Sequence, residues 1–244
     1  MAGFKDVFQR IEVKYLLDYM QYTALMKRLE NMAAIDSYGK TSILNIYFDT
    51  PDFRLIERSL EKPVYKEKLR LRTYGTAKDD TNAFIEIKKK YKGVVYKRRI
   101  SMPYSDAIDY LVNGRRPKER SQISDEIDYF VQYYKGLAPA MAISYDRIAM
   151  AGIQDPDLRI TFDTNITWRT ENLSLKEGNW GKDILLPGQH LMELKIAGAM
   201  SMELARILDE LNIRKTSFSK YGKGYIDYMY NDKKGEEIPC LQAV

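Results

Sequence analysis

Apolar and polar side chains alternate along eight segments of the chain, which predicts β-strands because successive residues of a strand face opposite sides. The predicted strands cover residues 9–15, 43–49, 67–74, 83–90, 94–101, 141–149, 157–163 and 191–196. Apolar residues recur at helical spacing over 18–33, 105–113, 122–135 and 200–212, and 220–231 is predicted as a final helix. The pattern predicts an α+β protein with a large sheet or barrel.

The connections between these segments favour antiparallel pairing. Asp79-Asp80 and Lys92-Gly93 are typical of hairpin turns between neighbouring strands. The segment 170–190, with several Gly and Pro residues, is predicted as the longest loop. We expect one domain over residues 1–232 and a poorly ordered C-terminal tail over 233–244.

The same alternation separates the charged residues. In the third strand Lys68, Arg70 and Arg72 face away from Leu69 and Leu71. Taken over all strands, the in-phase cations are Arg10, Lys14, Lys68, Arg70, Arg72, Lys88, Lys90, Lys97, Arg99, Arg147, Arg159 and Lys195. The in-phase anions are Glu12, Glu86, Asp163 and Glu193, whereas Arg98 and Asp146 are out of phase with their neighbours.

This face carries more positive charge than the chain as a whole, whose net charge is +5. One interpretation is an ordinary solvated face, with helices on the apolar face. Like charges opposite one another on neighbouring strands are destabilising, however, so the pattern favours a bound polyanion inside a barrel. Arginine and lysine both suit phosphate oxygens. A carboxylate among them suits a divalent cation that also binds phosphate, which makes Glu12, Glu86 and Glu193 candidate metal ligands; simple charge balance is the alternative.

Composition narrows the chemistry further. No run of 18 apolar residues occurs and residues 1–10 lack the apolar centre of a signal peptide, so we expect a soluble cytoplasmic protein. The single cysteine, Cys240, excludes an internal disulfide, and the single histidine, His190, excludes a multi-histidine zinc site. We interpret His190 as structural.

Several segments, in this order and spacing, resemble the vacuolar transporter chaperone (VTC) domain, the polyphosphate polymerase branch of the triphosphate tunnel metalloenzymes. They begin with Arg10-Ile-Glu-Val-Lys14-Tyr15, Tyr47-Phe48-Asp49-Thr50 and Lys68-Leu-Arg70-Leu-Arg72. They continue with Glu86-Ile-Lys88, Lys97-Arg-Arg99, Tyr145-Asp-Arg147, Arg159-Ile-Thr161-Phe-Asp163, Glu193-Leu-Lys195 and Ser219-Lys220-Tyr221. The resemblance implies an eight-stranded antiparallel β-barrel, the triphosphate tunnel, with a charged interior and flanking helices.

The resemblance also implies roles for the matching residues. The catalytic residues would be Arg70, Arg72, Lys88, Lys97, Arg147 and Arg159. Substrate would be bound by Lys14, Arg10, Lys68, Lys90, Arg99, Tyr145, Lys195, Lys220 and Lys223, although the Ser-Lys-Tyr motif fixes only Lys220. The metal, Mn²⁺ or Mg²⁺, would bind Glu193, with Glu12 and Glu86 as further candidates.

Three functions remain open. A polymerase transfers the γ-phosphoryl group of ATP to a growing polyphosphate chain, a tunnel triphosphatase hydrolyses inorganic or nucleoside triphosphate, and an accessory module only binds polyphosphate. Arg10 replaces the first glutamate of the triphosphatase signature Glu-x-Glu-x-Lys, which favours the polymerase branch. The chain resembles a stand-alone bacterial-type member, without the inositol-phosphate-sensing domain and membrane helices of eukaryotic subunits. We expect no nucleic-acid partner: the 19 tyrosines sit among basic residues, as in single-strand binders, but they are scattered along helices and strands, and core packing explains most of them.

Overall fold

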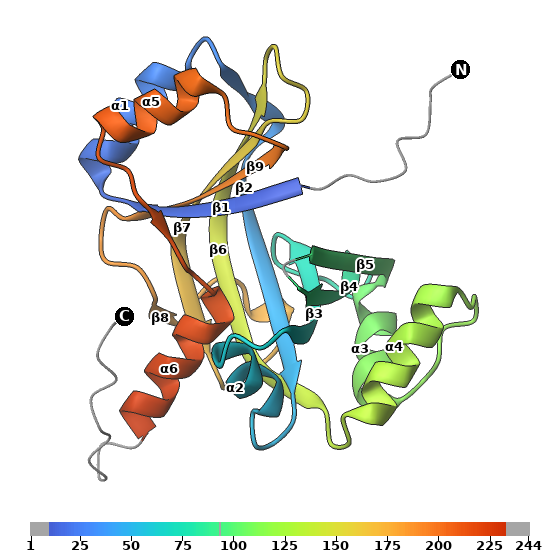
Figure 1. Cartoon of the computed structure of the whole chain (residues 1–244). Helices are drawn as coiled ribbons and strands as arrows, with labels where there is room; N and C mark the ends of the chain where they lie inside the picture. The colour runs from blue at the N-terminus through green and yellow to red at the C-terminus, as the bar shows by residue number, and fades with distance from the viewer. Residues whose placement is uncertain (1–9, 93, 233–244) are drawn as a thin grey trace, which may run out of the picture.

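A computed structural model describes residues 10–92 and 94–232 and shows one antiparallel sheet flanked by helices (Figure 1). The strands are β1 (Arg10–Leu17), β2 (Ala33–Asp49), β3 (Tyr65–Tyr74), β4 (Asn82–Tyr91), β5 (Val94–Pro103), β6 (Ala138–Gly152), β7 (Arg159–Arg169), β8 (Lys182–Asp183), β9 (His190–Ala197) and β10 (Lys215–Thr216). The helices are α1 (Tyr19–Leu29), α2 (Arg54–Leu60), α3 (Tyr104–Asn113), α4 (Gln122–Tyr133), α5 (Met202–Glu210) and α6 (Lys220–Asp232), with a 3₁₀ turn at Leu175–Glu177.

All eight predicted strands and five predicted helices are present, and the α+β class is confirmed. The structure adds β8 and β10, which are only two residues long and therefore too short to show an alternation of apolar and polar residues. It also adds α2, a seven-residue helix whose first turn is capped by the side chain of Asp49, at the end of the preceding strand. The Asp49 carboxylate at the end of β2 accepts hydrogen bonds from the backbone N–H groups of Leu55 (2.8 Å) and Ile56 (3.0 Å). A helix of two turns leaves too short a pattern to predict.

The sheet has the order β10-β1-β9-β7-β6-β2-β3-β4-β5, and β8 pairs with β7. Helices α1 and α5 cover the outer face of its first half, where Leu25, Leu29 and Leu204 pack on Phe162 and Leu194. Helices α3 and α4 cover the outer face of the second half, where the apolar side chains of β3 and β4 are buried. The apolar face is therefore turned outward beneath helices, and the charged face is turned inward.

The ladder does not close into a complete cylinder among the described residues, because β5 pairs only with β4 and β10 only with β1. Side chains bridge the gap instead. Lys88 on β4 approaches Glu12 on β1 at 3.9 Å, and Lys68 on β3 donates to the Ser219 hydroxyl before α6 at 3.1 Å. Helix α6 packs on the inward side, with Tyr221 donating to Asp49 at 2.8 Å. The predicted barrel is thus a curved sheet with one unpaired seam.

The longest predicted loop, 170–190, is present apart from the 3₁₀ turn and β8. Buried Arg169 holds it by donating to the carbonyls of Asn172, Ser174, Gly178 and Trp180. Asp79-Asp80 lies in the β3–β4 connection as predicted, and Gly93 of the β4–β5 turn and the tail 233–244 lie outside the described residues. No helix in the described ranges is long and apolar enough to cross a bilayer.

Candidate functional site

Glu86 on β4 is the centre of a first group of charges on the inner face. Glu86 is 1% exposed. One carboxylate oxygen accepts a hydrogen bond from the Arg70 Nε at 2.7 Å and lies 2.6 Å from the Arg70 Nη2, and the other lies 2.6 Å from the Lys97 ammonium. Arg72 lies 3.9 Å away. Burial alone would raise the pKa of Glu86, but Arg70, Arg72 and Lys97 outweigh it and lower the pKa to about 2. Glu86 therefore stays ionised at neutral pH and separates the positive charges of Arg70, Arg72 and Lys97.

Two tyrosines and an asparagine fix the arginines of this first group. Arg70 donates to the Tyr47 hydroxyl at 3.1 Å, and Arg72 donates to the Tyr145 hydroxyl at 3.1 Å and the Asn45 side-chain oxygen at 2.8 Å. Burial would raise the pKa of Tyr47, but Arg70 and Lys68 lower it to about 8. These contacts hold the two guanidinium groups in place before any ligand arrives.

Glu193 on β9 is the centre of a second group. It is contacted by Lys220 at 3.0 Å and by Lys14 and Arg147 at 3.4 Å each. Asp163 on β7 joins the group, since it binds Arg147 at 2.6 Å and Lys220 at 2.6 Å. Burial would raise the pKa of Glu193, but Lys220 and Lys14 hold it well below its usual value. Burial likewise opposes the charge of Lys220, yet Glu193 and Asp163 raise its pKa.

Tyr145 joins the two groups. Its hydroxyl accepts from Arg72 of the first group, while the ammonium of Lys220 and the guanidinium of Arg147 lie 4.6 and 5.2 Å from its ring centre. Cations over an aromatic ring are stabilised by its quadrupole. The ring therefore brings cations of β3, β6 and α6 within reach of one ligand.

A row of lysines, of which only Lys88 pairs with a carboxylate (Glu12) among the described residues, continues from these groups toward one end of the inner face. The β3–β4 register places Lys66 opposite Lys90 and Lys68 opposite Lys88. Burial and the neighbouring lysines lower the pKa of Lys68 to about 8. Beyond them lies an open cavity of about 420 Å³ lined by Lys62, Pro63, Val64, Lys66, Lys90, Lys92 and Ser217. Repeated like charges face each other here, as expected of a site for a polyanion.

The other predicted site residues lie at the margins of this arrangement. The Arg99 guanidinium stacks 4.8 Å from the Phe84 ring centre, and half-buried Lys195 is the ladder partner of Glu12. Arg159 is exposed and donates to the Pro156 and Leu158 carbonyls, and Lys223 is exposed on α6. The Arg10 side chain lies outside the described residues. Out-of-phase Arg98 and Asp146 point outward as expected, toward Glu126 and Ser42.

The acidic residues differ in their suitability for a metal. Glu12 and Glu193 both approach Lys14, at 3.7 and 3.4 Å, so a single cation could bridge them. Mg²⁺ and Mn²⁺ are commonly held by one or two carboxylates together with substrate phosphates, which fits this pair. Glu86 is contacted by Arg70, Arg72 and Lys97, and no second carboxylate is paired with these cations in the described part of the chain, so it offers one oxygen pair already bound to cations. No group of three or more His, Cys, Asp or Glu that could hold a metal without substrate occurs among residues 10–92 and 94–232.

Sequence reasoning did not single out Asn45, Tyr47, Asp163 and Ser219 as site residues. Asn45 and Tyr47 share a parity with Asp49 on β2, but neither is charged, so the pattern of charges gave no reason to choose them. Ser219 lies in a connection, where no parity applies, and it accepts from Lys68.

The curved antiparallel sheet with an inward charged face is the triphosphate tunnel architecture. A Bacillus halodurans protein described as a candidate adenylate cyclase shares it, with a TM-score of 0.53 and 16% identity over 86% of this chain and 93% of that one. HpAC1 from Hippeastrum, reported to have a dominant triphosphatase activity, matches with a TM-score of 0.53 and 16% identity over 95% and 98% of the two chains. At this identity both comparisons show the fold alone.

The family is shown by sequence. The model of the VTC domain matches residues 9–228, and the chain belongs to the VTC domain family, as its motifs indicated. Vacuolar transporter chaperone complex subunit 4 of Schizosaccharomyces pombe is 28% identical over 159 residues. The aligned part is 57% of this chain but only 22% of that protein.

Proposed function

We propose that the protein is a polyphosphate polymerase that transfers the γ-phosphoryl group of ATP to the end of a polyphosphate chain. The observation that carries the proposal is the row of facing lysines that leads away from the two ion-paired groups. A triphosphate needs only a compact set of cations, whereas a longer polyanion is stabilised by cations that continue beyond it. The VTC domain family and its S. pombe member support the same choice.

The reaction requires no protein nucleophile. A terminal phosphate oxygen of the chain forms a bond to the γ-phosphorus, the bond from that phosphorus to the β-phosphate oxygen breaks, and ADP leaves with the electron pair. Phosphoryl transfer depends mainly on alignment and on stabilisation of charge on the transferring group. Arg70 and Arg72, held by Tyr47 and Tyr145, would bind its oxygens from one side, and Arg147 and Lys220 from the other.

Glu193, with Glu12 beside it, would hold the divalent cation, Mn²⁺ or Mg²⁺. When bound, this ion neutralises charge on the phosphate oxygens. Lys14, Arg147 and Lys220 now neutralise Glu193, and each can turn to a phosphate oxygen when substrate enters. The site would thereby exchange carboxylate–cation pairs for phosphate–cation pairs without burying an unpaired charge. We also propose a cytoplasmic location, where ATP is abundant.

A tunnel triphosphatase is the second candidate. The reported triphosphatase activity of HpAC1, a protein of the same fold, favours it. A triphosphatase would release single phosphates from ATP or inorganic triphosphate. Its substrate would be too short to contact the row of lysines outside the two groups. A non-catalytic polyphosphate-binding module is the third, and would retain the lysines without turnover.

One experiment separates the three. Purified protein is incubated with ATP and Mn²⁺ or Mg²⁺, and the phosphate products are sized on a gel and compared with ADP release. We expect long chains in proportion to ADP. Single phosphate as the sole product would identify a triphosphatase, and polyphosphate binding without ADP release would identify an accessory module. Lys220→Ala should abolish the reaction, while Glu210→Gln, a change of an exposed ion-paired carboxylate on α5, should leave it intact.

A further inference from the structure

The outer face of the sheet is uncovered near the β4–β5 turn. Tyr91, Val94 and Tyr96 are 45%, 45% and 55% exposed, and Val64 beside them is 62% exposed. The register places Tyr91 opposite both Tyr65 and Val94, and Tyr96 opposite Lys89, so the aromatic side chains share one face. A backbone hydrogen bond of 3.0 Å from Lys92 to the Val64 carbonyl fixes Val64 to the same turn.

The helical cover of the sheet ends beside this patch. Glu126 of α4 binds Lys89 at 2.5 Å and Arg98 at 3.4 Å, and these two residues share the outward face with Tyr91 and Tyr96. On the covered side of that contact, Ile127 and Phe130 of α4 are buried in the core. On the uncovered side lies the patch formed by Val64, Tyr65, Tyr91, Val94 and Tyr96, whose side chains are 36% to 62% exposed. Tyr65 also lines a pocket with residues of α2.

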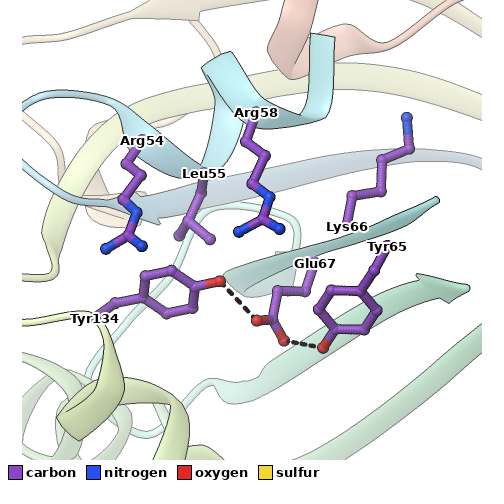
Figure 2. Close-up of a pocket in the computed structure, with 7 residues that line it drawn as sticks. All are labelled: Arg54, Leu55, Arg58, Tyr65, Lys66, Glu67 and Tyr134. Carbon is purple, nitrogen blue, oxygen red and sulfur yellow. Dashed lines mark hydrogen bonds between the residues drawn. The ribbon is translucent and has the colours of Figure 1, made fainter. Parts of the chain in front are cut away.

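Cations surround this patch. Lys62, Lys66, Lys90 and Lys92 line the adjoining cavity, and no acidic residue is among its described lining residues. On the other side, Arg54 and Arg58 of α2 point toward Tyr134 and Glu67, next to Tyr65 (Figure 2). Glu67 contributes one negative charge beside them, and its two oxygens accept hydrogen bonds from the Tyr65 and Tyr134 hydroxyls at 2.7 Å each. With Glu67 and Glu126 counted, the charges named around the patch remain net positive, because the lysines and arginines outnumber these two carboxylates.

We propose that this patch, formed by Val64, Tyr65, Tyr91, Val94 and Tyr96, binds the surface of an anionic lipid bilayer. Tyrosines suit the interface between headgroups and acyl chains, and the valines can enter the acyl boundary. The surrounding lysines and arginines are attracted to anionic headgroups, each contributing on the order of 1 kcal/mol close to the surface. Apolar contact and charge attraction together make a peripheral, reversible attachment.

Charge argues against the other occupants. A second copy of the chain would place one ring of cations against another, which is repulsive. A free polyphosphate chain complements the lysines but leaves the valines and tyrosine rings in water. The β5 edge also carries Lys97, Arg98 and Arg99, charges that oppose pairing with another strand. A bilayer satisfies both the apolar and the charged parts of the surface.

The attachment has a consequence for the site. Lys66 and Lys90 point inward to the cavity, while their strand neighbours Tyr65 and Tyr91 point outward to the patch. The membrane-bound protein would therefore hold the lysine-lined end of its inner face next to the bilayer. The attachment itself does not depend on catalysis, and it can be tested whether or not the proposed polymerase activity is found.

The test is co-sedimentation of the full chain with vesicles of phosphatidylcholine alone and of phosphatidylcholine mixed with phosphatidylglycerol. We expect binding to the mixed vesicles, weakened by salt, and little binding to the neutral ones. The variant Tyr91→Ser/Val94→Ser/Tyr96→Ser should lose binding to the mixed vesicles by at least about tenfold, because its apolar contact is removed. Ile35→Ser/Tyr38→Ser, which changes exposed side chains on a distant part of β2, is the matched control and should bind as the parent does.

Polyphosphate binding and thermal unfolding of the patch variant show whether it is folded, since its three changed side chains point away from the inner face. Failure of the parent to bind anionic vesicles would overturn the proposal. Equal loss in the patch variant and the control would overturn it too, as would equal binding of parent and patch variant. A parent dimer that the patch variant loses would identify the surface as a contact between copies instead.

Discussion

Glu86 and Glu193 are both buried carboxylates surrounded by three cations, yet they belong to different kinds of environment. The cations that contact Glu86 come from β3 and β5, the two strands that flank its own strand β4, and the described residues place no second carboxylate in contact with them. The partners of Glu193 come from β1, β6 and α6, and Asp163 and Glu12 share them. Glu86 is held by the strands on either side of it, whereas Glu193 is held by the adjacent strand β1, by β6 two strands away and by helix α6.

The difference indicates separate tasks. Because Asp163 also binds Arg147 and Lys220, these cations keep an anion when Glu193 is engaged elsewhere. Arg70, Arg72 and Lys97 pair with Glu86 and with no second carboxylate among the described residues, so Glu86 is their counter-charge until an anionic ligand binds. We infer that Glu86 is a structural anion that spaces the arginines, and that Glu193 can change partners during a reaction.

The largest expected effect is that of Glu193→Gln on turnover. If the carboxylate holds the divalent cation, turnover should fall by at least about a hundredfold. Polyphosphate binding without metal should stay the same or tighten, because one anion is removed from the inner face. Steady-state kinetics at limiting and saturating Mn²⁺, beside equilibrium binding of polyphosphate, measure both quantities. Turnover close to that of the parent would assign Glu193 to charge balance, like Glu86.

The reverse expectation applies to Glu86→Gln, whose main effect should be on stability. It leaves buried Arg72 and partly buried Arg70 without an anion, which costs about 3 kcal/mol, or a fall in unfolding temperature on the order of 10 °C for a chain of this size. Added polyphosphate supplies the missing negative charge, so it should stabilise this variant more than the parent. Thermal unfolding with and without polyphosphate tests this. A variant as stable as the parent would contradict the structural role.

A smaller effect is expected from pH. Burial lowers the pKa of both Lys68 and Lys97 to about 8, and the pKa of Tyr47 is also about 8 because Arg70 and Lys68 outweigh its burial. As pH rises through 8, the lysines lose positive charge and the phenol gains negative charge, so all three changes weaken anion binding. We expect polyphosphate affinity to fall roughly tenfold from about pH 7 to pH 9. Lys68→Arg should flatten this profile; an unchanged profile would show that Lys68 does not contact the ligand.

The smallest expected effect is that of Tyr47→Phe, which removes the hydroxyl that accepts from Arg70. Because Glu86 still holds Arg70, we expect a loss of only about threefold to tenfold in affinity, the value of one hydrogen bond. Tyr145→Phe provides the comparison, since its hydroxyl serves Arg72 next to the Glu193 group. Isothermal titration with triphosphate measures both. A larger loss from Tyr47→Phe than from Tyr145→Phe would reverse the order of importance of the two groups.

The structure changes what is expected for the stability of a variant that lacks both Arg70 and Arg72. From strand parity, removing Arg70 and Arg72 relieves like-charge repulsion and should not destabilise the chain. The structure shows that these arginines neutralise Glu86, which is 1% exposed, so removing both leaves a buried carboxylate with Lys97 alone. Parity reports which residues share a face, but not which of them pair across it.

By itself, the sequence determined the strands, the inward charged face and the family, because alternation with period two is a local property and the motifs that carry the resemblance are contiguous. The tertiary structure decided how the charges divide. It brought Lys220 from α6 to Glu193 on β9 and placed Tyr145 between the two groups. It also aligned Lys66, Lys68, Lys88 and Lys90, of which only Lys88 pairs with a carboxylate, Glu12, within the part of the chain that the structure describes. It also left the tyrosines at the β4–β5 turn uncovered. These are distances between elements far apart in the chain, and they depend on curvature of the sheet and on helix packing, which no local period encodes.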